Sequence, residues 1–183
     1  SESGNMAFID EVIPFANKDQ ATVYEHLKRA VDFSMKHLGP HGLPAGLYAD
    51  WNDCLRLGKE GESSFVALQY FYAMTILKKF AVYKKDDAYI AFLEEKQKEL
   101  GERIQKLCWN EDRFIRGFTE SGEVIGKRTD KEANMWLNPQ SWAVISGLAT
   151  AEQADKALDM VYERLNTEYG AVLMDPPYHF DAF

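Results

Sequence analysis

The sequence SSFVALQYFYAMTIL, residues 63–77, contains no charged side chain and is apolar or aromatic at most positions. Its composition predicts a helix from about Ser63 to about Tyr83. A helix that is apolar on every face has to be buried on every face, so this segment is expected at the centre of a helical domain. The stretch is too short to span a bilayer, and it contains Ser, Gln and Tyr.

The segments around this helix predict helices of a second type. After Asp86-Asp87, apolar residues follow one face while Glu and Lys take the other, which is typical of a helix exposed to water on one side. Thr22 and Thr150 each begin a capping box, so helices are expected to follow them. Asn138-Pro139 offers an N-cap with Pro at the first helical position, before the almost uncharged residues 140–149. This alternation of buried and half-exposed helices favours a two-layered toroid of helical hairpins over a four-helix bundle.

The composition argues against several classes of function. The chain has 183 residues, about the length of one domain, and a formal net charge of -8. Such an acidic chain is poorly suited to binding nucleic acid, and 46% apolar residues are ample for a packed core. Cys54 and Cys108 do not make a disulfide framework, and no secretory signal opens the sequence. We therefore expect a cytoplasmic protein with no nucleic-acid or membrane partner, in which residues 1–6 are a tag or linker remnant.

Two long connections, residues 39–62 and 109–137, separate the predicted helices, and connections of this length are usually functional or disordered. Both are rich in Trp, Gly and charged residues, which favours ordered functional loops. In the second, residues 114–118 followed by Ser121-Gly122 predict a short hairpin. The first contains Tyr48-Ala49-Asp50-Trp51-Asn52-Asp53. An indole suits the C–H face of a sugar, carboxylates and amides suit its hydroxyls, and a carboxyl group beside apolar rings can keep its proton and act as a general acid. The same residue types also suit helix caps and turns, and the sequence contains no metal-ligand spacing or Gly-rich phosphate loop.

Segments in order along nearly the whole chain resemble the glycoside phosphorylases of glycoside hydrolase family 94, the cellobiose and chitobiose phosphorylase family. The matching segments are Tyr24–Leu27, Gly42-Leu43-Pro44 with Tyr48–Leu55, Gly61-Glu62-Ser63, Asn138–Gly147 and Asp175–Tyr178. One such match is weak, whereas several in register are specific. The resemblance implies an all-α fold, part of an (α/α)6 barrel with alternating inner and outer helices and long rim loops, which agrees with the pattern of helices.

The resemblance also implies a reaction. Members of the family cleave a β-glucosidic bond with inorganic phosphate and invert the anomeric centre, which gives an α-sugar 1-phosphate. Asp53 is then the general acid that protonates the glycosidic oxygen, Trp51 and Tyr48 belong to the sugar site, and Asp50 either fixes the loop or binds a sugar hydroxyl. Because phosphate is itself the nucleophile, one acid suffices where an inverting hydrolase needs two carboxylates. We expect a glycosyltransferase-type phosphorylase of carbohydrate metabolism, with inorganic phosphate as co-substrate, no cofactor and no metal.

Several alternatives stay open. Cellobiose is the expected disaccharide, with N,N'-diacetylchitobiose and other β-glucosides as alternatives. An inverting glycoside hydrolase would use Asp50 or Glu62 as base, and a non-catalytic helical module would bury Asp53 in hydrogen bonds. The family's catalytic domain is longer than this chain, so residues 1–183 are expected to be a partial catalytic domain. We expect this fragment to be inactive alone and to need the remainder of the same enzyme, as a homodimer when full length.

Overall fold

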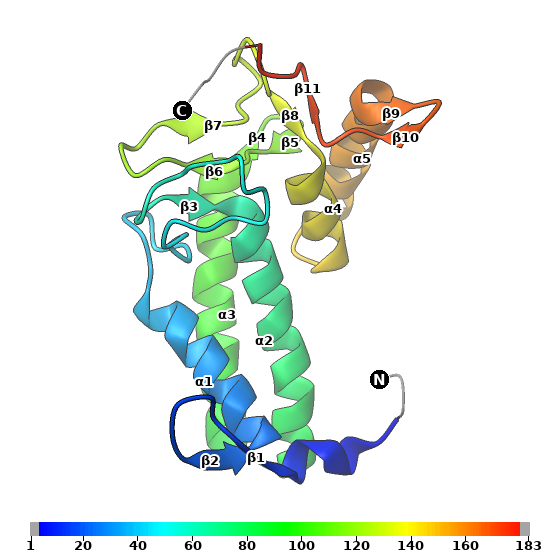
Figure 1. The fold of residues 1–183 in the computed structure, drawn as a ribbon. Coiled ribbons are helices and arrows are strands. Elements are labelled where there is room, and N and C mark those ends of the chain that lie inside the picture. The colour runs from blue at the N-terminus through cyan, green and yellow to red at the C-terminus, as the bar shows by residue number, and fades with distance from the viewer. Residues whose placement is uncertain (1–3, 180–183) are drawn as a thin grey trace.

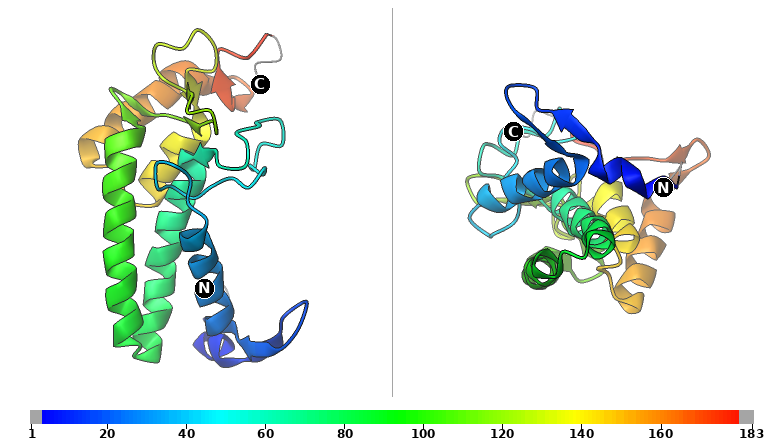
Figure 2. Two further views of the ribbon diagram at one scale, coloured as in Figure 1. Left: turned by 90° about the vertical axis from the view of Figure 1, so that its left-hand side faces the viewer. Right: turned by 90° about the horizontal axis from the view of Figure 1, so that it is seen from below.

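The computed structural model describes residues 4–179. Its lower part consists of three long helices, α1 (Val23–Lys36), α2 (Ser64–Lys84) and α3 (Asp87–Cys108), and α2 packs against both of the others (Figures 1 and 2). The helix predicted from about Ser63 to about Tyr83 is confirmed to within one residue at each end. Its start is fixed by the Ser63 hydroxyl, which accepts a hydrogen bond from the Val66 amide.

Two further helices, α4 (Leu137–Ile145) and α5 (Ala151–Leu165), pack against each other at the upper end of the molecule (Figure 1). The capping box predicted at Thr150 is confirmed, with Gln153 as its second member. The N-cap predicted at Asn138 is wrong, since α4 begins at Leu137 and its N-cap residue is Trp136. Trp136 already belongs to a strand, so the chain passes directly from strand to helix without a side-chain cap.

Short strands fill the connections between these helices. They are β1 (Val12–Pro14), β2 (Gln20–Thr22), β3 (Glu62–Ser63), β4 (Trp109–Asn110), β5 (Arg113–Phe114), β6 (Gly117–Phe118), β7 (Val124–Ile125), β8 (Met135–Trp136), β9 (Asn166–Thr167), β10 (Gly170–Ala171) and β11 (Met174–Asp175). The predicted hairpin around Ser121-Gly122 is present as β6 and β7, and β3 joins its other edge in an antiparallel three-stranded sheet. A 3-10 helix, η1 (Met6–Asp10), precedes β1.

The all-α fold expected from the sequence, as part of an (α/α)6 barrel, is therefore wrong. About half of the chain is helical and 15% is strand, distributed over several small sheets. Most of these strands are two residues long, so they show no alternation of apolar and polar side chains that a sequence could reveal.

Residues 1–3, half of the predicted tag or linker, lie outside the described residues. Within the other half, Asn5 caps η1 by accepting a hydrogen bond from the Ala7 amide.

The main core joins α1, α2 and α3 to the strands above them. It includes Leu68 and Met74 of α2, Leu93 and Ile104 of α3, and Phe114 of β5, all of them buried. By length and composition alone, α2 is the one helix in residues 4–179 that could cross a membrane, although 39% of that stretch is buried inside the protein. Burial of residues 63–77 on every face is not observed, since Ala73 is exposed and Phe71, Tyr72 and Ile76 are only half-buried.

Candidate active site

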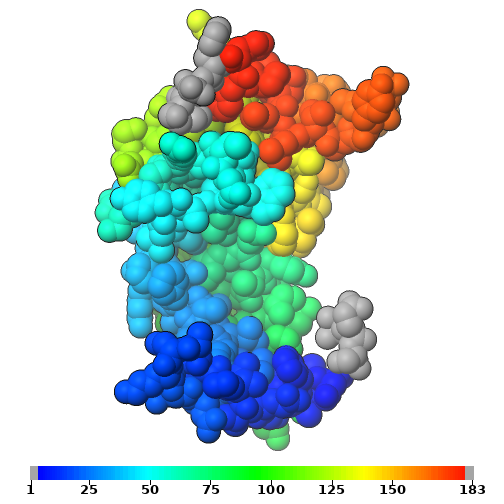
Figure 3. Space-filling model, in the orientation of Figure 1, coloured from blue at the N-terminus to red at the C-terminus, as the bar shows by residue number. Residues whose placement is uncertain are grey.

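The loop from His37 to Ser63, between α1 and α2, forms part of the upper surface of the molecule (Figure 3). Backbone hydrogen bonds close it: the Gly46 amide donates to the Gly61 carbonyl over 2.8 Å, and the Leu47 amide donates to the Lys59 carbonyl over 2.9 Å. Leu47 and Tyr48 both have positive φ angles, 52° and 68°, which residues other than glycine rarely adopt. The strained turn leaves the Tyr48 ring 78% exposed, and such strain is typical of ligand-binding loops.

Glu62 holds the start of the loop from below. Its carboxylate is buried and accepts hydrogen bonds from the backbone amides of His41 and Leu43, over 3.0 and 2.9 Å. Nδ1 of His41 lies 2.5 Å from the same carboxylate, and the His41 ring stacks on Phe118 of β6. The two amide bonds fix the backbone of the loop and the third contact holds the His41 ring, so Glu62 is occupied as a structural anchor.

Asp50 forms a buried ion pair with Arg116, which lies between β5 and β6. Each of the two side chains is 1% exposed. The Asp50 carboxylate also accepts from the Asn52 amide over 2.9 Å, and Nη1 of Arg116 donates to the Ser63 hydroxyl over 2.7 Å. Burial lowers the pKa of Arg116, and the neighbouring Asp50 carboxylate opposes that effect. The pair therefore joins the middle of the loop to the sheet, while Oδ2 of Asp50 has no hydrogen-bond partner among the described residues.

A cavity of about 390 Å³ lies beside this ion pair. Three of the four predicted site residues line it, namely Tyr48, Asp50 and Asp53. Asp53 is exposed, and within residues 4–179 no group forms a hydrogen bond or ion pair with its carboxylate. Arg56 lines the same cavity, although the sequence argument did not select it.

Trp51, the fourth predicted residue, is not among the residues that line this cavity. Its indole is 67% exposed and meets the ring of Phe65 edge-on, with ring centroids 6.4 Å apart. Phe65 stands at the start of α2 and is itself buried, so it supports the indole from beneath. The loop thus presents an open aromatic face next to, but outside, the cavity that contains Asp53.

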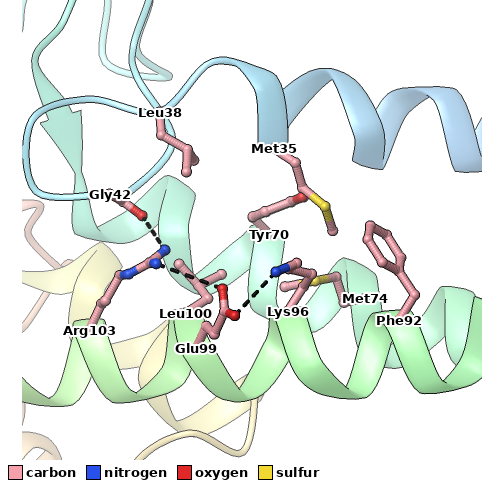
Figure 4. A pocket seen from close by; sticks show the side chains of 10 residues that line it. All are labelled: Met35, Leu38, Gly42, Tyr70, Met74, Phe92, Lys96, Glu99, Leu100 and Arg103. Carbon is pink, nitrogen blue, oxygen red and sulfur yellow. Dashed lines mark hydrogen bonds and ion pairs between the residues drawn. The ribbon is translucent and has the colours of Figure 1, made fainter.

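A second cavity, of about 300 Å³, lies between α1, α2 and α3, away from these residues (Figure 4). Its polar side chains are paired with one another: Lys96 contacts Glu99, Glu99 contacts Arg103, and Arg103 donates to the Gly42 carbonyl (Figure 4). None of the four predicted site residues lines it. In the part of the chain that the structure describes, no cluster of His, Cys, Asp or Glu could hold a metal ion.

One loop carries an exposed indole, together with a carboxylate and a guanidinium that have no partner among residues 4–179. These groups define a candidate carbohydrate-binding site with an acid in it. Comparison with known proteins agrees with this class and gives the family. Residues 1–182 match the catalytic domain of the Glycosyl hydrolase 94 superfamily, and the chain belongs to that family.

Among characterised relatives, the chain is 38% identical over 179 residues to an N,N'-diacetylchitobiose phosphorylase of Vibrio furnissii, which covers 97% of this chain and 22% of the relative. It is 33% identical to a solabiose phosphorylase of Paenibacillus borealis, over 97% of this chain and 24% of the relative. It is also 33% identical to a cellobionic acid phosphorylase of Neurospora crassa, over 97% of this chain and 23% of the relative. The chain therefore spans 22 to 24% of the length of these enzymes.

A solved structure with a similar fold is that of a GH78 family rhamnosidase of Bacillus sp. GL1. The TM-score is 0.62 at 14% sequence identity, over 76% of this chain and 14% of that one. At this identity the likeness concerns the fold alone.

Proposed function

We propose that this chain supplies the general acid of a phosphorylase that cleaves a β-glucosidic disaccharide with inorganic phosphate. The reaction transfers a glycosyl group to phosphate with inversion, so it is of the glycosyltransferase type, and Asp53 donates the proton to the leaving oxygen. The observation that carries the proposal is the state of Asp53: its carboxylate is exposed, has no partner among the described residues and lines a cavity together with Tyr48 and Asp50.

This arrangement suits an acid that acts alone. A general acid has to come within hydrogen-bond distance of the oxygen it protonates, which requires an accessible carboxyl group. Phosphate brings its own nucleophilic oxygen, so no second carboxylate has to activate water. Tyr48 and Trp51 offer exposed rings five and two residues before Asp53, where a sugar can lie against them.

The contacts of the other carboxylates speak against an inverting hydrolase. Such an enzyme needs a second carboxylate that is free to hold a water molecule. Asp50 is paired with Arg116, and Glu62 accepts from His41 and Leu43. Neither candidate base is available. A purely structural helical module would tie up Asp53 in hydrogen bonds, and no such bond is present in residues 4–179.

The disaccharide is proposed as one of two. Cellobiose is the expectation from the motif, whereas two of the characterised relatives, at 38% and 37% identity, are N,N'-diacetylchitobiose phosphorylases. Both substrates contain a β-linked sugar, so the same acid serves either of them. The choice depends on groups around the sugar ring rather than on Asp53.

The test uses the full-length gene product that carries this chain, incubated with cellobiose or N,N'-diacetylchitobiose, with and without inorganic phosphate. We expect α-sugar 1-phosphate only when phosphate is present. Asp53→Asn should lower kcat by about 10²- to 10⁴-fold, the usual contribution of a general acid. Asp155→Asn, which changes an exposed Asp on α5, is the matched control and should keep full activity. Sugar release without phosphate would indicate a hydrolase, and an active Asp53→Asn protein would exclude Asp53 as the acid.

A further inference from the structure

We infer that Asn52 is a positioning residue for Asp53, and that it holds the acid at the cavity by fixing the peptide groups on either side of it. The inference rests on the proposed function, in which Asp53 is the general acid. It goes further by giving a role in the reaction to a residue that does not line the cavity.

The side chain of Asp53 has no restraint of its own. Its carboxylate forms no hydrogen bond or ion pair with residues 4–179, so its place at the cavity depends on the backbone that carries it. A general acid has to come within hydrogen-bond distance of the oxygen it protonates, and a displacement of about 1 Å can cost about 10²-fold in rate. Other groups therefore have to fix the backbone at Asp53.

Asn52 supplies two of these restraints. Its side-chain Oδ1 accepts a hydrogen bond from the Cys54 amide over 3.1 Å, which holds the peptide group that follows Asp53. Its backbone carbonyl, in the peptide group that precedes Asp53, accepts from the Leu55 amide over 2.8 Å. The first bond is that of an Asx turn, in which an Asn side chain takes the part of a backbone carbonyl. Leu55 is buried in an apolar cluster with Trp136, so the turn is anchored to the protein interior.

Asn52 is itself held by the buried ion pair. Its backbone amide donates to Asp50 over 2.9 Å, and Asp50 is paired with Arg116. Arg116 in turn donates to the hydroxyl of Ser63, the residue that caps α2, over 2.7 Å. A continuous series of hydrogen bonds therefore runs from the start of α2 to the peptide groups of Asp53, and Asn52 is the last side chain in it.

A role in positioning the acid and a role in stability alone predict different kinetics. A residue that only stabilises the loop affects every reaction at the site, whereas one that acts through the acid affects only the donation of a proton. The disaccharide needs that proton, because its glycosidic oxygen leaves as a hydroxyl group. A β-glycosyl fluoride does not need it, because fluoride leaves with its electron pair as an anion. In both reactions a phosphate oxygen forms the new bond to the anomeric carbon.

The experiment compares phosphorolysis of the disaccharide with phosphorolysis of the corresponding β-glycosyl fluoride by the full-length gene product. Asn52→Ala should lower kcat for the disaccharide about 10- to 100-fold, and leave its KM and the turnover of the fluoride within about twofold of wild type. Asn52→Ser keeps a shorter side-chain acceptor and should recover part of kcat.

The matched control is Asn110→Ala, outside the cavity. Asn110 also accepts with both of its oxygens, from the Arg128 amide with its side chain and from the Asp112 amide with its carbonyl. Its substitution removes the same kind of bond and should keep the activity with both substrates.

A second comparison removes the acid. Asp53→Asn leaves no carboxyl group to position, so adding Asn52→Ala should lower kcat for the disaccharide no further. A further loss of about 10-fold or more in that background would overturn the inference. Equal losses with the disaccharide and the fluoride in a folded Asn52→Ala protein would also overturn it; if that variant does not fold, Asn52→Ser takes its place in both comparisons. No sugar 1-phosphate from the wild-type protein with either disaccharide would overturn the proposed function, and the inference with it.

Discussion

Asp50 and Asp53 are chemically identical and only three residues apart, yet their surroundings give them different roles. The Asp50 side chain is 1% exposed and paired with Arg116, which fixes it in place. Asp53 is exposed and has no partner in residues 4–179. Two carboxyl groups whose environments differ in this way are a common basis for dividing acid and structural roles in an active site. The loop therefore contains one carboxylate that is fixed and one that is accessible to a ligand.

The Asp50–Arg116 pair leads to a prediction about stability. Arg116→Met removes the guanidinium and leaves the Asp50 carboxylate buried without a counter-charge, so we expect the free energy of unfolding to fall by about 3–5 kcal/mol. Adding Asp50→Asn removes the stranded charge and should restore part of that loss. Urea denaturation of the two single variants and the double variant measures the coupling between them. Strictly additive losses would show that the two side chains do not stabilise each other.

The sequence was sufficient to find Asp50 and Asp53 and insufficient to find Arg116, the partner of Asp50. The motif residues lie close together because they are neighbours in the chain, so their common cavity follows from their spacing. Arg116 is 66 residues from Asp50, and the contact exists only because β3 pairs with β6. Arg56 is visible in the sequence as a cation three residues after Asp53, but only the folded structure shows that no carboxylate in the described part of the chain pairs with it.

At the scale of the elements, helices were predictable where their ends carry a local chemical signal. Ser63, Thr22 and Thr150 cap α2, α1 and α5 with their hydroxyls, and the sequence places those starts correctly. The start of α4 was predicted two residues late because its N-cap residue, Trp136, forms no side-chain capping hydrogen bond. Apart from the hairpin of β6 and β7, the two-residue strands were missed, because their own composition carries too little signal to show them.

The N-terminus of α3 gives a prediction about pH. Asp86 caps this helix through the Tyr89 amide and also accepts from Lys28 and from the Tyr24 hydroxyl, over 3.2, 3.2 and 3.1 Å. Burial tends to raise the pKa of Asp86, but the bonds from Lys28, from the Tyr89 amide and from Tyr24 outweigh that effect and hold the pKa below its ordinary value of 3.8. A carboxyl group with a lowered pKa stabilises the folded state above its unfolded pKa and loses that contribution as the pH falls through the folded value.

We therefore expect Asp86→Asn, which keeps a capping oxygen but removes the charge, to lower the free energy of unfolding by about 1 kcal/mol at pH 7. The difference from wild type should shrink as the pH falls below 3.8, the ordinary value for Asp86. Asp87→Asn is the matched control: this exposed neighbour in the first turn of α3 should change stability by only about 0.3 kcal/mol. Urea denaturation at pH 7 and at pH 3 compares the three proteins. An undiminished difference at pH 3 would mean that the charge of Asp86 contributes nothing.

At the scale of the whole molecule, the candidate site depends on contacts between segments that are distant in the sequence. The loop carrying Asp53 emerges between α1 and α2, while the hairpin that supports it follows α3 (Figure 1). The two are joined by β3 and β6, in which Glu62 pairs with Phe118 and Ser63 pairs with Gly117. Glu62 holds the loop, and Ser63 accepts from Arg116. A substitution in the hairpin should therefore displace the loop that lines the cavity, even though the described residues of the hairpin do not line it themselves.

Gly117 tests this connection. A Cβ atom at this position would lie 2.2 Å from the Glu62 carbonyl oxygen, far inside any normal contact, so Gly117→Ala has to push β3 and β6 apart. We expect a loss of about 1–3 kcal/mol in the free energy of unfolding, as for other overpacked sites. Because Glu62 moves with β3, the amides of His41 and Leu43 should exchange hydrogen faster, and the activity that depends on Asp53 should fall with them.

The matched control is Gly122→Ala, at the tip of the same hairpin. Its added Cβ would meet nothing within 4 Å, but its φ of +85° strains any side chain, so we expect a local loss of about 1 kcal/mol. The loop amides should then exchange as in the wild-type protein, because β3 and β6 stay paired. Hydrogen exchange followed by mass spectrometry on both variants separates strain in the hairpin from displacement of the loop. If both variants lose stability but neither speeds exchange at His41 and Leu43, the hairpin does not support the site, and the loop is held by its own hydrogen bonds alone.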